Sequence, residues 1–195
     1  MSVAELRRLV PPPSAPVAPG SLQEWAAVEQ RLGLVFPADY KEYIATYGSG
    51  AFPGLLFVMN PMKRVSFTDH VTYYLHSLDG QLEATRGAFG GGEEYRGEAR
   101  PFPLWPEPAG LFPWGWMGMD GASKLFWLTE GDPDRWPVVW GDPYEPRWFN
   151  GPYTTTMTSF LAGTLRGAYS TGGDMQPKPD SAGLFKFNDL DSGLD

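Results

Sequence analysis

The residue types that most often carry chemistry in proteins are scarce in this sequence. It contains two histidines, His70 and His76, and no cysteine. The histidines are six positions apart on a predicted helix, and six positions turn a helix by about 600°, which places the rings on roughly opposite sides. They therefore do not bind one metal ion together, and without cysteine there is no thiol nucleophile, disulfide or cysteine zinc site. We expect neither a metal nor a cofactor.

Carboxylates could act in pairs as general acid and base, as they do in glycosidases. The glycines at 90–92 could be taken for a phosphate-binding loop, but Glu93 and Glu94 follow them where Lys and Ser or Thr would be needed. There is no Gly-x-Ser-x-Gly motif either. Most acidic residues lie in predicted turns, where Asp accepts backbone hydrogen bonds, so we expect structural roles and no enzyme. The carboxylates considered are Glu83, Glu93, Glu94, Asp120, Asp132 and Asp142.

Tryptophan is the residue type with the strongest potential for binding. Four of the eight tryptophans fall in predicted strands, and two more lie in loops. Cross-strand aromatic pairs stabilise a sheet, so most of them are expected in the core. Alternation along the strands nevertheless sends some to the other sheet face, and exposed tryptophans anchor protein interfaces. The candidate partner-binding residues are Trp105, Trp114, Trp116, Asp120, Trp127, Trp136 and Trp140.

Composition limits the class of partner. The chain has 195 residues, which favours one domain, and a formal net charge of −8, which repels nucleic acid and anionic membranes and favours a basic partner. The 29 aromatic residues (8 Trp, 9 Tyr, 12 Phe) can build a sizeable core. No run approaches the roughly 20 apolar residues of a membrane span, and the first ten residues lack the apolar run of a signal peptide. We expect a cytoplasmic protein.

The N-terminal half reads as a proline-rich segment followed by helices. Residues 1–20 are expected to form an extended strap, read as a connector along the domain or as a docking peptide for a proline-binding partner. A helix over 22–32 is predicted by a capping box of Ser21 and Glu24 and by a stop at Gly33. A second helix runs from Pro37 to Tyr47. The run 55–59 predicts a strand, and a third helix begins near Ser66 or Thr68 and ends before Gly80 or runs on toward Thr85.

The C-terminal half reads as an antiparallel meander. A long surface excursion is expected over 86–110, because this stretch is rich in glycine and proline. The segments 112–117 and 125–128 predict a hairpin, and turns at 130–134 and 141–143 lead to two more strands. Thr155 or Thr156 caps a last helix that carries Met157, Phe160, Leu161 and Leu165. Residues 169–195 form an acidic tail, read as flexible or loosely docked, or as a segment that folds onto the sheet or a partner.

Two stretches of the sequence carry a resemblance to a known family. The pattern Trp-x-x-x-Glu-x-x-Leu-Gly-Leu-x-Phe-Pro-x-Asp-Tyr over 25–40, with Tyr-Gly-x-Gly over 47–50, resembles the opening signature of the SUKH superfamily, the Smi/Knr-like immunity proteins. Leu-Phe-Pro-Trp-Gly over 111–115, Leu-Phe-Trp-Leu over 125–128 and Ser-Phe-Leu over 159–161 are similar to its strand pair and closing helix. The proline-rich lead-in and the segment 136–139 resemble actinobacterial members. The signature residues are Trp25, Glu29, Gly33, Pro37, Asp39, Tyr40, Tyr47, Gly48 and Gly50.

The resemblance implies a fold and a mode of action. It covers a domain over 21–168 and implies an α+β fold, a single central antiparallel β-sheet flanked by N-terminal helices and a C-terminal helix. It implies no catalytic residues. Many members of the family neutralise a co-encoded polymorphic toxin, often a nuclease, by a stoichiometric complex, whereas some eukaryotic relatives are regulatory scaffolds. The chain is therefore interpreted as an immunity protein, monomeric or weakly dimeric, with a housekeeping scaffold as the alternative and an enzyme third.

One part of the sequence departs from the family pattern. The turn of the predicted hairpin, residues 119–123, is longer than the Asn-Gly-Asp that the family often carries there, and its order differs. Because a shift of one residue in register moves every side chain to the other sheet face, the faces of the two strands are not predicted by the resemblance.

Overall fold

The computed structural model describes residues 3–52, 56–62, 67–88, 101–117, 123–141 and 149–169, and within these it describes only the backbone of residues 70, 79 and 81–88. The described parts form an α+β fold, in agreement with the sequence prediction. The helices are α1 (Val3–Leu9), α2 (Leu22–Leu32), α3 (Ala38–Tyr47), α4 (Phe67–Ala88), the short 3-10 helix η2 (Pro133–Arg135) and α5 (Met157–Leu165). The strands are β1 (Ala51–Phe52), β2 (Leu56–Val58), β3 (Leu111–Met117), β4 (Ser123–Leu128), β5 (Val138–Gly141) and β6 (Phe149–Tyr153).

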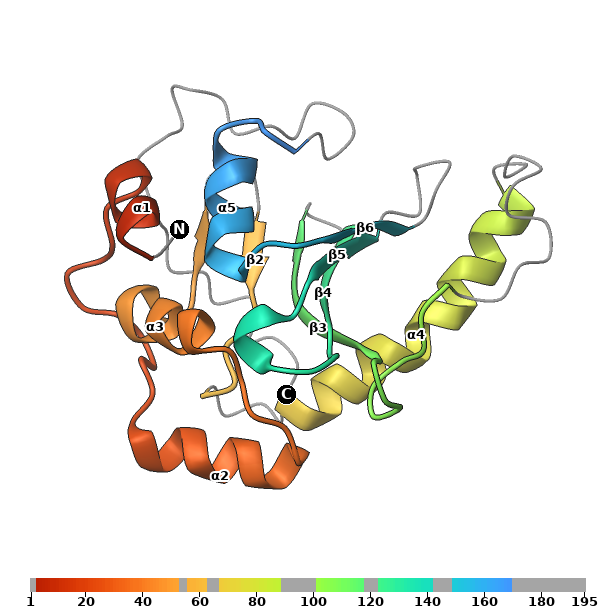
Figure 1. The fold of residues 1–195 in the computed structure, drawn as a ribbon, viewed down its shortest axis with the longest axis horizontal. Coiled ribbons are helices and arrows are strands. Elements are labelled where there is room, and N and C mark those ends of the chain that lie inside the picture. Colours follow the sequence, from red (N-terminus) through yellow and green to blue (C-terminus); the bar gives the residue numbers. More distant parts are fainter. Residues whose placement is uncertain are drawn as a thin grey trace.

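The six strands form one sheet in the order of the sequence, and every neighbouring pair is antiparallel. The predicted meander and its first hairpin, β3 with β4, are therefore confirmed (Figure 1). The register of that hairpin shifts between Pro113 and Gly115, which interrupts the alternation of side chains along β3.

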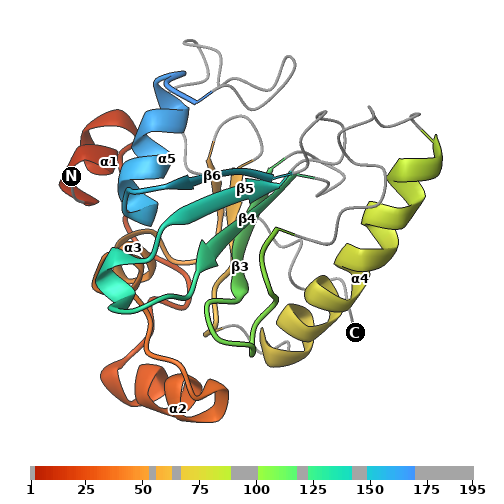
Figure 2. The ribbon, with the colours of Figure 1, turned by 45° about the vertical axis from the view of Figure 1, so that its right-hand side comes forward.

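Helices lie on both sides of the sheet. α1, α3 and α5 gather on one side and α4 lies on the other, and both views agree (Figures 1 and 2). On the first side, the Trp127 ring of β4 lies 5.0 Å from the Tyr40 ring of α3. On the second, the Lys124 ammonium of β4 lies 4.1 Å from the centre of the Tyr74 ring of α4. Adjacent positions along a strand point to opposite sheet faces, and every residue of β4 is buried.

Residues next to α2 and α5 form the helix caps that the sequence predicts. The hydroxyl of Ser21 and the carboxylate of Glu24 form the predicted capping box of α2, and Gly33 ends the helix at φ 64°. Thr156 caps α5 by accepting a hydrogen bond from the Ser159 amide. Pro37 occupies the cap position of α3 rather than its first turn.

Two helices differ from the prediction. α4 continues past Gly80 to Ala88, beyond both predicted ends. The structure also places a helix, α1, in residues 1–20, where only an extended strap was expected. Its buried side chains, Val3 and Leu6, lie before the prolines, so nothing prevents helical hydrogen bonds there. Residues 11–20 contain no helix, as their prolines predict, and Val17 forms a parallel bridge with Gly48.

Three other predicted segments are described in part. Residues 101–110 form a loop that packs on the domain, because Phe102, Leu104 and Trp105 are partly buried against the core. The excursion was predicted over 86–110. Residues 101–110 are indeed a loop at the surface, with several exposed residues, but residues 86–88 belong to the end of α4, and residues 89–100 lie outside the described residues. Residues 142–148, which include two of the three residues of the predicted turn at 141–143, and residues 170–195 of the predicted tail also lie outside them.

Candidate partner-binding surface

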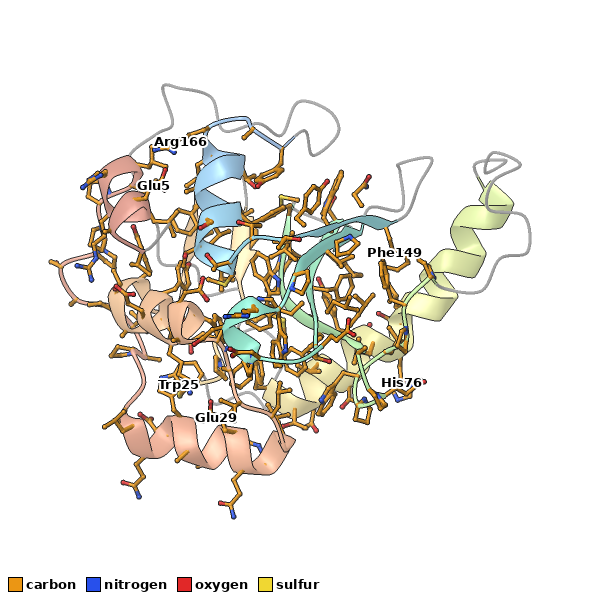
Figure 3. The ribbon with its side chains drawn as sticks, in the orientation of Figure 1. Glu5, Trp25, Glu29, His76, Phe149 and Arg166 are labelled. Carbon is orange, nitrogen blue, oxygen red and sulfur yellow. The ribbon has the colours of Figure 1, made fainter. Side chains whose placement is uncertain are left out.

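The first signature residues join α2 to α3. The Trp25 ring packs edge-on against Phe36 and Tyr40, each with a centroid distance of 5.7 Å. Glu29 accepts a hydrogen bond from the Phe36 amide at 2.8 Å and pairs with the Lys41 ammonium at 2.5 Å. Figure 3 shows both side chains on the side of α2 that faces the rest of the domain. These residues hold α2 in place and leave no charge of this pair free for chemistry.

The next signature residues tie α3 to other elements. One oxygen of the Asp39 carboxylate accepts hydrogen bonds from both the amide and the hydroxyl of Thr158, each at 2.9 Å. Asp39 therefore satisfies donors at the first turn of α5, which is 119 residues away in sequence. The Tyr40 hydroxyl donates to the Met59 carbonyl oxygen at 2.5 Å. In the same way, Asp134 of η2 accepts a hydrogen bond from the Ala38 amide at the start of α3.

The last signature residues hold the N-terminal segment. The Tyr47 hydroxyl donates to the Val10 carbonyl oxygen at 2.7 Å. Gly48 has φ 66°, and a Cβ atom built there would lie 2.3 Å from the Val17 oxygen. The adjacent Ser49 amide donates to that same oxygen at 2.9 Å, and Gly50 directly precedes β1. With Gly33 and Pro37 at helix ends, the contacts of the signature residues are structural ones.

Burial corrects the prediction for four of the candidate tryptophans. Trp114 is 0% exposed, Trp127 1%, Trp140 4% and Trp136 5%. Trp114 packs on Trp127 and on Phe160 of α5, so helices cover the sheet face that was expected to be open. A partner has no access to these four side chains in this structure, and their place is in the core.

Trp105 and Trp116 are the two candidate tryptophans that remain partly exposed. The Trp105 ring packs edge-on against Phe112, at the beginning of β3. The Trp116 ring stacks on Phe57 near the end of β3, with a centroid distance of 5.1 Å and an angle of 13° between the planes. The two residues therefore lie at opposite ends of the strand. Asp120, the other candidate, lies outside the described residues.

The largest exposed aromatic side chain in the described part was not among the candidates. Tyr73 of α4 is 72% exposed. Its position could have been predicted, because Val71, Tyr74, Leu75 and Leu78 define the buried face of that helix and Tyr73 falls outside it. The other exposed large apolar residues are Leu22, Val35 and Val17.

Of the six carboxylates considered for acid–base chemistry, the structure describes the side chain of Asp132. The Asp132 carboxylate accepts a hydrogen bond from the Asp134 amide at 3.1 Å, which is the turn role expected of it. His76 is exposed. Within the described ranges, no three residues of the metal-binding types come together. The side chains of Glu83 and His70, both on α4, are not described, and Glu93, Glu94, Asp120 and Asp142 lie outside the described residues.

Three buried tyrosines have strongly raised pKa values. Burial raises the pKa of Tyr47 to about 12, although the Arg7 charge opposes the shift. Burial also raises the pKa of Tyr43 well above its ordinary value, and the neighbouring Tyr47 and Tyr40 add to the effect. The pKa of Tyr74 rises because the phenol is buried. These phenols stay protonated at neutral pH, so they act as packing and hydrogen-bonding groups.

Comparison with known proteins identifies a family and nothing narrower. Residues 19–161 match the SMI1 / KNR4 family (SUKH-1). This range contains every signature residue discussed above and ends within α5, but it excludes α1. No curated protein and no solved structure matches the chain. Among the described residues, no helix is long and apolar enough to span a membrane.

Proposed function

Because this chain belongs to the SMI1 / KNR4 family (SUKH-1), we propose that it is an immunity protein that neutralises a toxin domain by forming a stoichiometric complex with it. The family match is the observation that carries the proposal, since members of this family act by binding. The contacts of the signature residues are consistent with this, because they build the scaffold and leave its exposed surface to vary with the partner.

The charge of the chain suggests the kind of toxin. A net charge of −8 favours a basic partner, and nuclease domains bind anionic phosphates with basic surfaces. Opposite charges steer association, which can approach about 10⁸ M⁻¹s⁻¹ at low salt. We therefore propose a basic nuclease domain as the partner. The complex would form in the cytoplasm, where such a toxin meets its substrate.

A co-expression experiment tests the proposal. The toxin domain encoded beside this chain is expressed alone and together with it, and cell survival and complex formation on gel filtration are measured. Survival only in the presence of the chain, with both proteins in one peak, is the expected result. Unrelieved killing and separate elution would reject the proposal and favour the alternative, a housekeeping scaffold of the same fold.

A further inference from the structure

α1 lies outside the residues that match the family, and it covers a part of the domain that those residues form. It precedes residues 19–161 and lies beside α5, on the side of that helix away from the sheet (Figures 1 and 2). Val3 and Leu6 of α1 are 0% exposed, and Val10 directly after it is 1% exposed. These three positions have the spacing of one helical face, so α1 docks as an amphipathic helix.

The surface beneath α1 is apolar because α5 has apolar residues on the side away from the sheet as well as on the side that faces it. Phe160 of α5 points toward the sheet, where the centre of its ring lies 6.3 Å from that of the Trp114 ring. Leu161 and Ala162 are turned about 100° and 200° away from Phe160 on the helix, and both are 0% exposed. Seven of the nine residues of α5 are buried, so this helix is covered on the side away from the sheet as well. On the side away from the sheet, α1 is the described element that lies next to it.

Polar contacts set the register of α1 on this surface, which we call the α3–α5 face. Glu5 forms an ion pair with Arg166 directly after α5, and Figure 3 shows the two side chains pointing toward each other. An Arg7 amino group donates to the Thr46 hydroxyl at 2.9 Å. The Tyr47 hydroxyl donates to the Val10 carbonyl oxygen. The α3–α5 face thus selects an apolar helix with a carboxylate opposite Arg166.

α1 is short and is joined to the next anchored part of the chain by a segment without helix or strand. A helix of seven residues is not stable alone in water, so α1 depends on docking, and the burial of three side chains competes with a conformational entropy cost of comparable size. The chain is anchored again at Val17, which bridges to Gly48, and at Ala18, whose carbonyl oxygen accepts from Asn60 at 3.0 Å. Residues 11–16 between helix and anchor contain no helix or strand.

We propose that the α3–α5 face is a binding site for an amphipathic helix of the partner, and that α1 occupies it in cis as a removable competitor. This inference rests on the proposed binding function. The partner's helix has apolar residues at i, i+3 and i+7 and an acidic residue two positions after the first, as Val3, Glu5, Leu6 and Val10 have in α1. Because the partner binds only when α1 is undocked, its apparent affinity is the intrinsic affinity multiplied by the fraction of time the face is uncovered.

The experiment uses the full-length chain and a fluorescent synthetic peptide of residues 3–12 as the probe. Leu6→Asp places a charge at a buried contact and releases α1. Ala4→Asp is the matched control, because Ala4 is on the exposed side of the same helix. Anisotropy titrations should give a dissociation constant at least about tenfold lower for Leu6→Asp than for wild type or Ala4→Asp. Hydrogen exchange should show loss of protection in α1 with α5 still protected.

A charge reversal supplies a second, specific readout. A peptide carrying Glu5→Lys should bind the Leu6→Asp chain at least about tenfold more weakly than the native peptide, and adding Arg166→Glu to that chain should restore binding. Equal binding of the native peptide to all chains, or loss of α5 protection in Leu6→Asp, would overturn the inference. Peptide binding by a chain that fails to protect against the toxin would reject only the proposed function.

Discussion

Tyr43 and Tyr47 are equally buried neighbours that differ in the hydrogen bonding of their hydroxyl groups. Tyr43 and Tyr47 stack at 5.2 Å and are both 0% exposed. The Tyr47 hydroxyl donates to Val10, whereas the Tyr43 hydroxyl has no partner among the described residues. The sequence predicted that both face the core, but not which hydroxyl is paired, because the Val10 carbonyl lies 37 residues away.

This difference predicts opposite results for two conservative substitutions. Tyr47→Phe should lower the free energy of unfolding by about 0.5–1.5 kcal/mol at pH 7, since it removes a made hydrogen bond. Tyr43→Phe should leave stability unchanged or raise it, since it removes a buried hydroxyl without a partner. Urea unfolding measures both. A larger loss for Tyr43→Phe would show that its hydroxyl is paired after all.

The raised pKa values predict an alkaline loss of stability. Below pH 10 both the folded and the unfolded chain hold the phenolic proton. Above pH 10 the unfolded chain loses it, while the folded chain keeps the Tyr47 proton up to a pKa of about 12. Ionisation therefore favours unfolding, and the free energy of unfolding should fall as the pH rises from about 10 to about 12. Tyr43→Phe should make that fall shallower, and an equal slope would contradict the account.

The remaining tryptophan candidates make a prediction about binding. Trp105 and Trp116 are partly exposed, and truncation of an interface hot spot costs at least about 2 kcal/mol of binding free energy. Trp105→Ala or Trp116→Ala should therefore weaken toxin binding, as measured by calorimetry. Leu22→Ala is the control, because Leu22 is 91% exposed on α2 and was not a candidate. Unchanged affinity in both tryptophan variants would remove them from the binding surface.

At the scale of elements, short-range signals were predicted well and long-range contacts were not. The capping box and Gly33 stop of α2 lie within one stretch of sequence, so both could be predicted. The sheet face on which each tryptophan of β3 lies could not be predicted, because it depends on the register shift between Pro113 and Gly115. After this shift, Trp114 packs on Phe160 of α5 and Trp116 stacks on Phe57. α1 was missed because a helix this short is stabilised by docking rather than by its own sequence.

Two helix-terminating glycines allow a matched test of the contact between α3 and the N-terminal segment. Gly33→Ala should cost about 1–2 kcal/mol, because its positive φ is strained for alanine although nothing lies within 4 Å of the new Cβ. Gly48→Ala should cost more, because its Cβ would also overlap the Val17 oxygen. Urea unfolding compares the two, and equal costs would mean that the segment near Val17 does not press on Gly48 in solution.

Asp39 provides the test of the link between α3 and α5. Asp39→Ala removes the acceptor of two Thr158 hydrogen bonds and should cost about 1–3 kcal/mol, with faster hydrogen exchange in the first turn of α5. Asp39→Asn keeps an acceptor oxygen and should cost less. If both variants are as stable as wild type, α5 does not depend on this carboxylate.

At the scale of the whole molecule, a family scaffold held by buried aromatic rings and carboxylate caps belongs to a chain with a net charge of −8. The net charge of −8 predicts that association with a basic toxin slows as salt rises, because screening shortens the range of attraction. Stopped-flow measurements should show an association rate constant that falls at least about tenfold between low and high ionic strength, with a smaller change in the dissociation rate constant. An association rate independent of salt would exclude electrostatic steering.

A titration of toxin activity tests the central claim most directly. A fixed amount of toxin domain is mixed with increasing amounts of this chain, and residual toxin activity is measured. Neutralisation by binding predicts a linear fall to zero at one equivalent, with full activity recovered from the toxin after the complex is dissociated in denaturant and refolded. Persistent activity at excess, or complete inactivation by a small fraction of an equivalent, would contradict it.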